Sequence, residues 1–327
     1  MTNKERYTAW CAEQPDLPVF MQPWWMDAVC AGKGWDVLLY VHPRTEQILA
    51  ALPYLTGKRL WMHFVLMPQQ TQIGGIWLDY SLRNDDGSVW DKETLQTICD
   101  YMAEQLAQMG LHYYYQHYPV GSPCPEFMKA RGMRIRERVT YRVEDLSDMD
   151  AVVKRFSRNK QRQLRKAQGL VVHRGELNAE QFYYFHCRCL ETRHKTISYS
   201  REFLMVLERK TRRNGCSEII SLTDRDGNLY AAAYVVWDKQ MMHYLIAACA
   251  PEQKDSGAMA RLVLECMRLA REVGVAFDFE GSMIPGVAKS FRQFGASAAT
   301  YFSVERFYRW WFRLPYWAYR LWTYNRR

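Results

Sequence analysis

The sequence lacks any long apolar run. None of its segments approaches the about 18 consecutive apolar residues that a membrane-spanning helix requires. Residues 1–18 mix acidic and basic side chains and have no apolar centre of the kind found in secretory signals. These absences argue against a membrane-spanning helix and against secretion, so we expect a cytoplasmic protein.

The sequence also lacks a disulfide or metal-binding pattern. Its nine cysteines are scattered and include no pair separated by two residues. The one local cluster consists of His186, Cys187, Cys189 and His194, but residues one or two apart do not share a face of a helix. We therefore expect buried, reduced cysteines and predict no metal site.

What the sequence does contain is typical of a positively charged globular protein. Hydrophobic residues make up 48% and charged residues 24% of its 327 residues, which is enough material for two domains. Its 44 Lys and Arg exceed its 35 Asp and Glu, for a net charge of +9. This charge favours anionic partners such as phosphorylated ligands, nucleic acid or acidic lipid, without choosing among them.

The two halves of the chain resemble each other. Residues 34–58 align without gaps with residues 215–239, and each copy reads as strand, turn, strand. Identical pairs in this alignment are Gly34 and Gly215, Arg44 and Arg225, Ala50 and Ala231, Ala51 and Ala232, and Lys58 and Lys239. Each copy continues with an amphipathic helix, a glycine, a strand, a short helix and a last strand.

This order predicts an α/β protein with two tandem domains, each a mixed, mainly antiparallel sheet flanked by helices. We expect a first domain over residues 1–145 and a second over residues 146–305. A helical tail rich in arginine and aromatic residues follows over residues 306–327. The alternative interpretation of the repeat is α/β patterning shared by chance.

The segment before the second amphipathic helix is a candidate phosphate-binding loop. It covers residues 247–258 and contains small residues together with Asp255 and Ser256, either of which can cap the helix. The N–H groups and the dipole at a helix start suit a phosphate. The alternative is an ordinary capped turn.

Several motifs resemble those of the FemAB-like branch of tandem GNAT N-acyltransferases, which includes aminoacyl-tRNA-dependent peptidoglycan-bridge enzymes. The motifs that carry the resemblance are residues 18–25, 158–167, 253–258, 277–282 and 286–295. The third is similar to the acyl-CoA pyrophosphate loop of GNAT enzymes, with Ser256 where that pattern has glycine. The resemblance implies two tandem GNAT-like domains, the second binding the donor through Gln253, Lys254, Ser256, Gly257 and Ala258.

Acyl transfer to an amine needs a proton acceptor and donors for the oxyanion. Strand alternation places Asp278 and Glu280 on one face, and we predict Glu280 as the base because α/β sites gather at strand ends. The alternative is that the two acids face solvent or pair with Lys289 and Arg292. Arg292 occupies the position of the family's lysine, where an arginine stabilises charge rather than exchanging a proton. Tyr301 is our candidate for the acid.

The first half is predicted to bind the acceptor or to be structural. Its position corresponding to the base is Gln116, whose amide cannot take a proton. Residues 74–80 resemble the family's acceptor segment, with Asp79 at the position of an acidic site residue. The alternative is a strand end with a solvated acid.

The segment between Asp150 and Glu176 contains no acidic residue. Its Arg158, Arg162 and Arg165 are four and three residues apart, as one helix face requires. We predict that they bind the phosphate of an acceptor or an RNA backbone. The alternative is an ordinary solvated surface.

The C-terminal tail has the composition of a bilayer interface. From Glu305 to the end, ten of 23 residues are aromatic and six are arginine. One expectation is peripheral contact with the inner face of the membrane. The other is a helix packed over the junction of the two domains.

These observations predict an N-acyltransferase that moves an acyl or aminoacyl group to an amine acceptor. A phosphorylated or lipid-linked acceptor is one form of this prediction. The loop favours acyl-CoA as the donor, and the family resemblance and the net charge leave aminoacyl-tRNA as a second donor. The alternative is a non-catalytic GNAT-like duplicate that binds RNA or a membrane surface.

Overall fold

The computed structural model describes residues 1–14, 16–30, 34–79, 91–192, 194–281, 283–314 and 316. The chain divides into two compact units. Unit 1 comprises residues 1–138 together with the chain from Thr300 onward, and unit 2 comprises residues 139–299.

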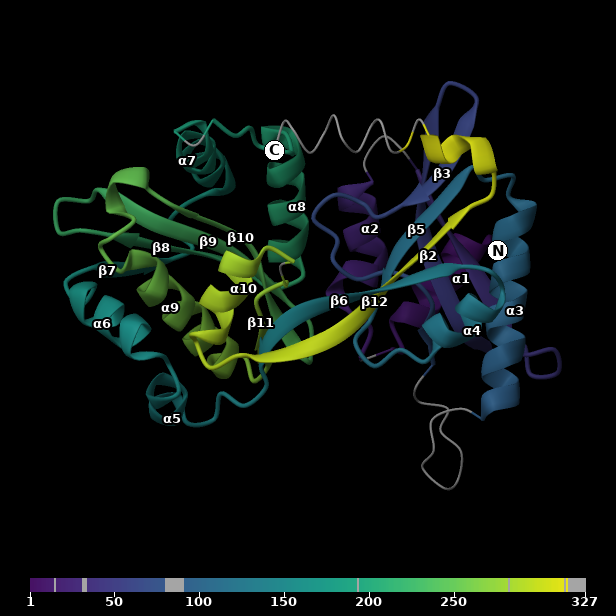
Figure 1. The fold of residues 1–327 in the computed structure, drawn as a ribbon, viewed down its shortest axis with the longest axis horizontal. Helices are drawn as coiled ribbons and strands as arrows, with labels where there is room; N and C mark the ends of the chain where they lie inside the picture. The colour runs from purple at the N-terminus through teal and green to yellow at the C-terminus, as the bar shows by residue number, and fades with distance from the viewer. Residues whose placement is uncertain are drawn as a thin grey trace. The chain divides into compact units, whose positions relative to one another are not determined.

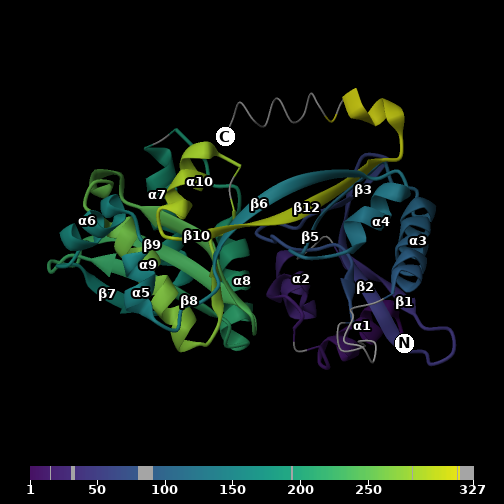
Figure 2. The ribbon, with the colours of Figure 1, turned by 60° about the horizontal axis from the view of Figure 1, so that its bottom comes forward.

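Unit 1 is a mixed sheet with helices on both faces (Figure 2). Its helical segments are α1 (Asn3–Cys11), η1 (Val19–Met21), α2 (Pro23–Val29), α3 (Lys92–Gln108), α4 (Cys124–Ala130) and η3 (Trp310–Phe312). Its strands are β1 (Trp35–Val41), β2 (Ile48–Arg59), β3 (Met62–Leu66), β4 (Trp77–Leu78), β5 (Tyr113–Tyr118) and most of β12 (Ser297–Phe307). The strand order is β1-β2-β3-β5-β12, in which β3 and β5 are parallel, and β4 pairs with β2.

The amphipathic pattern of residues 91–108 explains the core of unit 1. Asp91 caps α3 by accepting a hydrogen bond from the N–H of Thr94 at 2.8 Å. The apolar side chains of α3 then recur every three or four residues and pack on β2. The buried members of this cluster include Leu95, Ile98, Cys99, Met102 and Leu106 of α3 and Ala50, Leu52 and Tyr54 of β2.

Unit 2 is built in the same manner. Its helical segments are α5 (Met149–Lys154), α6 (Arg158–Lys166), α7 (Ala179–Glu191), α8 (Arg201–Arg213), η2 (Pro251–Gln253), α9 (Ala258–Glu272) and α10 (Pro285–Arg292). Its strands are β7 (Val171–Arg174), β8 (Ser217–Thr223), β9 (Leu229–Trp237), β10 (Met241–Cys249), β11 (Ala276–Asp278) and the end of β6 (Arg134–Val143). The strand order is β6-β11-β10-β9-β8-β7, in which β10 and β11 are parallel.

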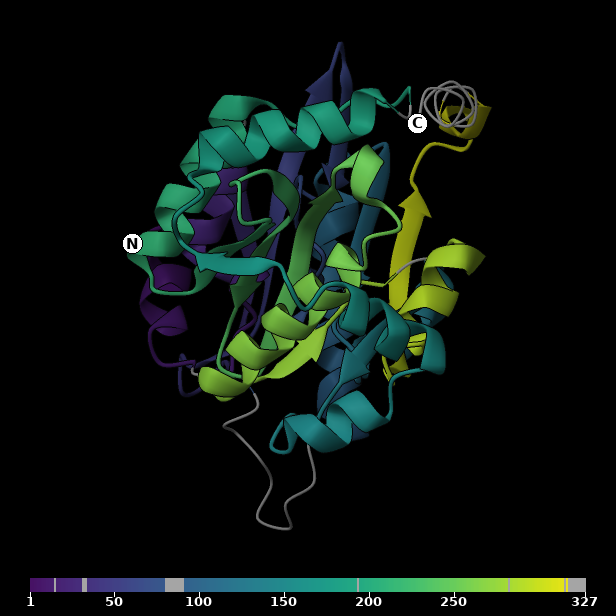
Figure 3. The same cartoon turned by 90° about the vertical axis from the view of Figure 1, so that its left-hand side faces the viewer.

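Helices cover both faces of the unit 2 sheet. Helix α9 runs across the strands (Figures 1 and 3) and packs on Ala231, Ala233 and Val235 of β9. Side chains alternate along a strand, so Tyr234 points to the opposite face. There its hydroxyl lies 2.7 Å from that of Thr211 in α8.

The structure confirms the predicted α/β fold with two similar halves. Apart from the short segments β4 and η2, the order β1-β2-β3-α3-β5-α4-β6 in the first half matches β8-β9-β10-α9-β11-α10-β12 in the second. Each half has one parallel pair, β3 with β5 and β10 with β11, joined by an amphipathic helix. Gly110 and Gly274 follow those helices with φ of 64° and 78°, which glycine adopts most readily.

The last strand of each half belongs to the sheet of the other unit. The end of β6 pairs with β11 of unit 2, where Phe277 faces Val143. Residues 302–307 of β12 pair with β5 of unit 1. The predicted boundaries after residues 145 and 305 placed β6 in the first domain and β12 in the second. The compact units instead divide between residues 138 and 139 and between residues 299 and 300. Alternation along a strand specifies a buried face but not the neighbouring strand.

Three further findings concern the described part of the chain. No helix there is long and apolar enough to cross a membrane. No group of three His, Cys, Asp or Glu side chains in those same ranges could hold a metal ion. All nine cysteines are free, and His186 Nδ1 lies 2.7 Å from the hydroxyl of Tyr199.

Candidate functional site

The parallel strands β10 and β11 pair over only three residues. The pairs are Met241 with Ala276, Met242 with Phe277, and His243 with Asp278, after which β11 ends while β10 continues to Cys249. On its other side, β10 has a bulge against β9 between His243 and Ile246. The carboxyl end of β11 therefore adjoins a stretch of β10 that is irregular on both sides, a position where α/β proteins place ligands.

His243 and Glu280 form a buried ion pair at this point. Nδ1 of His243 bonds Oε1 of Glu280, and Nε2 of His243 lies 3.5 Å from Oδ2 of Asp238. Burial alone would lower the pKa of His243, but the charges of Glu280 and Asp238 raise it to about 10. Burial also raises the pKa of Glu280, although His243 opposes this shift. The imidazole therefore carries the proton of the pair near neutral pH.

Asp278 holds the end of the strand in place. Its carboxylate accepts hydrogen bonds from the Thr140 hydroxyl, from Nε of Arg142 at 2.7 Å, and from the backbone N–H of Glu280 at 2.7 Å. In the contacts of the described residues, the two acids thus pair with Arg142 and His243 and not with Lys289 or Arg292.

The backbone at Glu280 is strained. Its φ is 64°, in the left-handed region that costs a non-glycine residue about 1–3 kcal/mol. The next residue, Gly281, has the same φ, and a Cβ there would lie 2.5 Å from the carbonyl oxygen of Val139. The turn after β11 therefore directs the Glu280 carboxylate back toward His243 at an energetic cost, as is common at functional sites.

The other two predicted catalytic residues lie in different surroundings. Arg292, on α10, donates from Nη2 to the Tyr141 hydroxyl at 2.8 Å. The backbone of Tyr141 accepts the N–H of Phe279, so Arg292 contacts the strand next to the end of β11. Tyr301 belongs to unit 1, where its ring centroid is 5.4 Å from that of His117. The catalytic roles of Arg292 and Tyr301 stay predictions.

The predicted donor loop forms η2 and the start of α9. The Ser256 hydroxyl donates to the carbonyl of Gln253 at 2.6 Å and accepts the first N–H of α9, from Ala258, at 3.2 Å. Lys254 is exposed, whereas Gly257 and Ala258 are buried. A Cβ on Gly257 would lie 2.1 Å from the carbonyl oxygen of Gln163 in α6. The glycine thus allows α6 to approach, which the sequence alone did not reveal.

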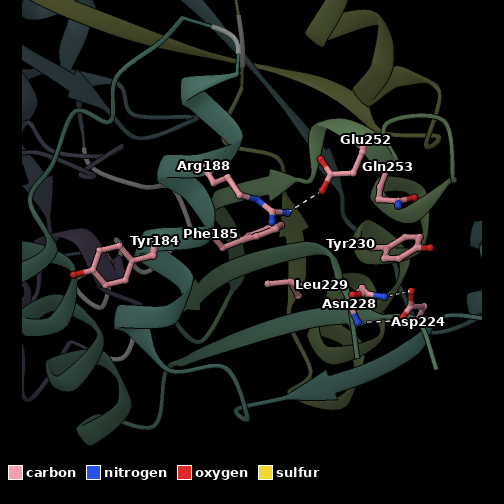
Figure 4. A pocket seen from close by; sticks show the side chains of 9 residues that line it. All are labelled: Tyr184, Phe185, Arg188, Asp224, Asn228, Leu229, Tyr230, Glu252 and Gln253. Atoms are coloured by element: carbon pink, nitrogen blue, oxygen red, sulfur yellow. Dashed lines mark hydrogen bonds and ion pairs between the residues drawn. The ribbon is translucent and has the colours of Figure 1, made fainter. Parts of the chain in front are cut away.

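Two cavities meet at this loop. One, of about 480 Å³, lies between α7, the β8–β9 hairpin and η2 (Figure 4). Its lining includes Tyr184, Phe185 and the Arg188–Glu252 ion pair of 3.0 Å. The other, of about 540 Å³, contains Ser256. It is also lined by two cationic side chains, Lys166 of α6 and Arg225 of the hairpin, and by two acidic ones, Asp224 and Asp226 of the same hairpin. Three residues line both cavities: Asp224, Tyr230 and Gln253.

The predicted basic face of α6 is exposed. Ser157 caps the helix, and Arg158, Arg162 and Arg165 all face solvent. Lys160 differs, because it is buried with Nζ 3.0 Å from the Ser290 hydroxyl and 4.3 Å from the centroid of the Phe294 ring. Burial lowers the pKa of Lys160. The helix therefore presents its arginines outward and uses Lys160 to contact α10.

Asp79 is buried in unit 1. Its Oδ2 accepts hydrogen bonds from Trp10 Nε1 at 3.4 Å and from Gln14 Nε2 at 3.2 Å, so the predicted acceptor residue also ties the β4 end to the N-terminal segment. The glycine pair before it permits close packing. A Cβ on Gly74 would lie 2.2 Å from Oε1 of Gln116. Asp79 as an acceptor contact stays a prediction, and Tyr80 lies outside the described residues.

Comparison with known proteins agrees with this fold. Residues 135–289 match the family of acetyltransferase (GNAT) domains. Among solved structures, the chain is similar to FemX, with a TM-score of 0.70 and 14% identity over 92% of this chain and 96% of that chain. It is also similar to a tandem GNAT protein from the clavulanic acid biosynthesis pathway, with a TM-score of 0.54 and 13% identity over 94% of this chain and 95% of the other.

A third similar structure is L-PGS from Bacillus licheniformis, with a TM-score of 0.51 and 12% identity over 84% of this chain and 85% of that chain. No curated protein matches the sequence. The predicted FemAB-like resemblance is thus confirmed in the fold: the chain has the tandem GNAT architecture, and residues 135–289 match the GNAT acetyltransferase domain family. The class of enzyme that this family indicates is an acyltransferase.

Sequence reasoning missed part of the candidate site. His243 carried a weak signal, because it is the one basic residue in the mainly apolar strand β10. Asp238 and Arg142 carried none, since Asp238 contacts His243 from the turn before β10 and Arg142 contacts Asp278 from β6. The cavity residues on α7 and the β8–β9 hairpin were also missed, because their contact with η2 exists only in the folded unit.

Proposed function

We propose that this protein is an N-acyltransferase that moves an acyl group from acyl-CoA to an amine acceptor. The observation that carries the proposal is the arrangement along β10. The His243–Glu280 pair lies where β11 ends, and the cavities around Gln253 and Ser256 follow the far end of the same strand. Strand β10 thus has the partner of the proposed proton acceptor at one end and the candidate anion site beyond the other.

The spacing favours an elongated donor. His243 and Cys249 are six positions apart, a distance of roughly 20 Å in an extended strand. A donor that uses both ends must keep its phosphates far from its reactive carbonyl. Acyl-CoA has this form, with a thioester at one end of a long arm and a pyrophosphate toward the other. Lys166 and Arg225 supply positive charge beside Gln253 and Ser256, in a cavity that Asp224 and Asp226 also line.

The reaction itself needs one proton acceptor. As the amine nitrogen bonds to the carbonyl carbon of the donor, Glu280 takes the proton that the nitrogen releases, and the carbon–sulfur bond then breaks. The raised pKa of Glu280 brings the carboxylate nearer to the basicity that this step requires. The positive charge of His243 balances the negative charge of Glu280 before the proton is transferred. A proton must return to the leaving thiolate, and Tyr301 remains the proposed acid.

The oxyanion needs donors that already point at it. The bulge sets Tyr244 and Leu245 against a single position of β9, between Val236 and Tyr234. One residue of such a bulge is left out of the ladder, so its N–H is available to the carbonyl oxygen of the donor. We assign this role to the bulge, and we assign to Arg292 the stabilisation of charge that its permanent cation allows.

The acceptor is proposed to be an amine near a phosphate. The exposed arginines of α6 would bind that phosphate, and unit 1, with Asp79, would bind the remainder of the acceptor or have a structural role. Aminoacyl-tRNA is a second candidate donor, because the same arginines and the net charge of +9 also suit an RNA backbone. The alternative function is a non-catalytic module that binds RNA or a membrane surface, and these arginines are what supports its RNA binding.

Donor binding by the full chain tests the proposal. Acetyl-CoA and longer acyl-CoAs should raise the melting temperature, because a ligand that binds only the folded state stabilises it. Changing Lys166 and Arg225 together to alanine should weaken binding at least tenfold by calorimetry. Lys239→Ala, which removes an exposed cation from the β9–β10 turn, is the matched control and should have no effect.

Two results would contradict the acyl-CoA proposal. One is equal acyl-CoA affinity in the double variant and the control. The other is transfer from charged tRNA in the absence of any response to CoA compounds, which would establish the second donor. Salt-sensitive RNA binding with no transfer from either donor would favour the non-catalytic alternative.

A further inference from the structure

Four large apolar side chains are exposed on two segments of unit 1. Leu60 and Trp61 form the turn between β2 and β3 and are 77% and 61% exposed. Trp310 and Leu314 follow β12 and are 78% and 75% exposed. Isolated exposed apolar residues are common and need no explanation. Four large ones that lie together on neighbouring segments do need one.

Ring contacts show that the two segments are neighbours. The ring of Trp61 lies 5.2 Å from that of Trp311, and Phe64 lies 5.3 Å from Phe312. In Figure 1 the yellow helical segment after β12 lies beside β3. Trp311 and Phe312 thus pack η3 against the β2–β3 hairpin, while Trp310 and Leu314 remain exposed. We call Leu60, Trp61, Trp310 and Leu314 the apolar tip of unit 1.

Cations surround the apolar tip. Lys58 and Arg59 precede Leu60, and Arg309 and Arg313 flank η3; all four are exposed. Arg309 is close enough to His112, a ring in contact with Trp61 and Trp311, to lower the pKa of that imidazole, after burial as the main cause. Neither residues 57–66 nor residues 306–314 contain an acidic residue. Within these two segments, the tip is therefore an apolar centre flanked by cations only.

We propose that this tip docks on an anionic lipid bilayer. Tryptophan rings favour the headgroup level, leucine side chains favour the hydrocarbon below it, and lysine and arginine attract acidic headgroups. A nucleic acid would satisfy the cations but offers nothing to Leu60 and Leu314. A second copy of the chain would set four cations against four cations, which opposes association. The bilayer alone matches both the apolar centre and the flanking cations.

Vesicle co-sedimentation of the full chain tests this proposal. Wild-type protein should bind vesicles of phosphatidylcholine with 30% phosphatidylglycerol at least tenfold more strongly than pure phosphatidylcholine vesicles, and rising salt should weaken this binding. Changing the four tip residues to serine should reduce binding at least tenfold. Changing Lys58, Arg59, Arg309 and Arg313 to glutamine should reduce it to the level seen with pure phosphatidylcholine.

A matched control keeps the test independent of surface hydrophobicity in general. Met283 and Ile284 are comparably exposed in unit 2, and changing both to serine should leave vesicle binding unchanged. The glutamine variant retains the tip and its packing, so it remains informative if the serine variant unfolds. The proposal is overturned if wild-type protein does not bind the anionic vesicles. It is also overturned if the control and glutamine variants bind alike, or if the tip variants only dissociate an oligomer in sedimentation velocity.

Discussion

The carboxylate of Glu280 accepts a hydrogen bond from the imidazole of His243, and both side chains are buried where β10 and β11 part. The contact joins residues 37 positions apart, because parallel strands bring the ends of β10 and β11 together across α9. Glu280 reaches His243 only through a left-handed backbone. A carboxylate that is held against a cation, and whose pKa is raised by burial, is suited to accept a proton from a substrate amine.

Glu280→Gln should reduce acyl transfer about a hundredfold while donor binding persists, because the amide keeps the shape of the side chain but cannot take a proton. Single-turnover rates and calorimetric donor affinities measure the two effects separately. Glu272→Gln, which changes an exposed partner of Arg174, is the control and should transfer at the wild-type rate. Full activity of Glu280→Gln would mean that the ion pair is structural.

The ion pair should make stability fall as pH rises. The pKa of His243 is raised to about 10 from its usual 6.5, so its contribution is complete below about pH 6.5 and is lost as pH approaches 10. Burial raises the pKa of Glu280 as well, so ionisation of Glu280 also decreases the stability as pH rises, but over a lower pH range. The total effect is on the order of a few kcal/mol.

Urea unfolding at a series of pH values measures this effect. The free energy of unfolding of the wild type should decrease between about pH 6.5 and 10, and His243→Gln should show a much smaller decrease over that interval. Identical pH profiles for the two proteins would show that the pair does not hold an excess proton in the folded state.

Gly257→Ala should destabilise the protein more than Gly274→Ala. Both glycines have positive φ, of 86° and 78°, so both substitutions incur the left-handed cost of about 1–3 kcal/mol. Only at position 257 would the new Cβ also meet a backbone oxygen, at 2.1 Å, whereas nothing lies within 4 Å at position 274. Chemical denaturation of the two variants, which sit at opposite ends of α9, compares them directly. Equal losses would mean that α6 can move away without cost.

Changing Arg158, Arg162 and Arg165 to alanine should distinguish an acceptor clamp from an RNA surface. In a clamp, the acceptor KM rises while general RNA affinity changes little. On an RNA surface, affinity falls for all sequences, and its dependence on the logarithm of salt concentration flattens by about one unit per lost phosphate contact. Steady-state kinetics and filter binding across a salt series provide the measurements. A variant unchanged in both assays would leave the arginines as ordinary solvated residues.

Much of the fold could be predicted because it depends on local patterns. The spacing of Leu95, Ile98 and Met102 is enough to predict a helix with one buried face, and the similar face of α9 reveals the repeat. The exchange of β6 and β12 could not be predicted, since both strands alternate in the same way and either sheet could accept either strand.

The sequence by itself determined the two-fold repeat of α/β elements, the positive charge, the loop before α9 and the positions of Glu280 and Arg292 in that repeat, because these depend on residue type and spacing along the chain. Only the tertiary structure decided what those residues contact. In the structure His243 pairs with Glu280, Gly257 contacts α6, and Trp61 lies beside Trp311. Each contact joins segments distant in sequence, and the pairing of distant segments is set by the packing of whole strands and helices, which no local pattern encodes.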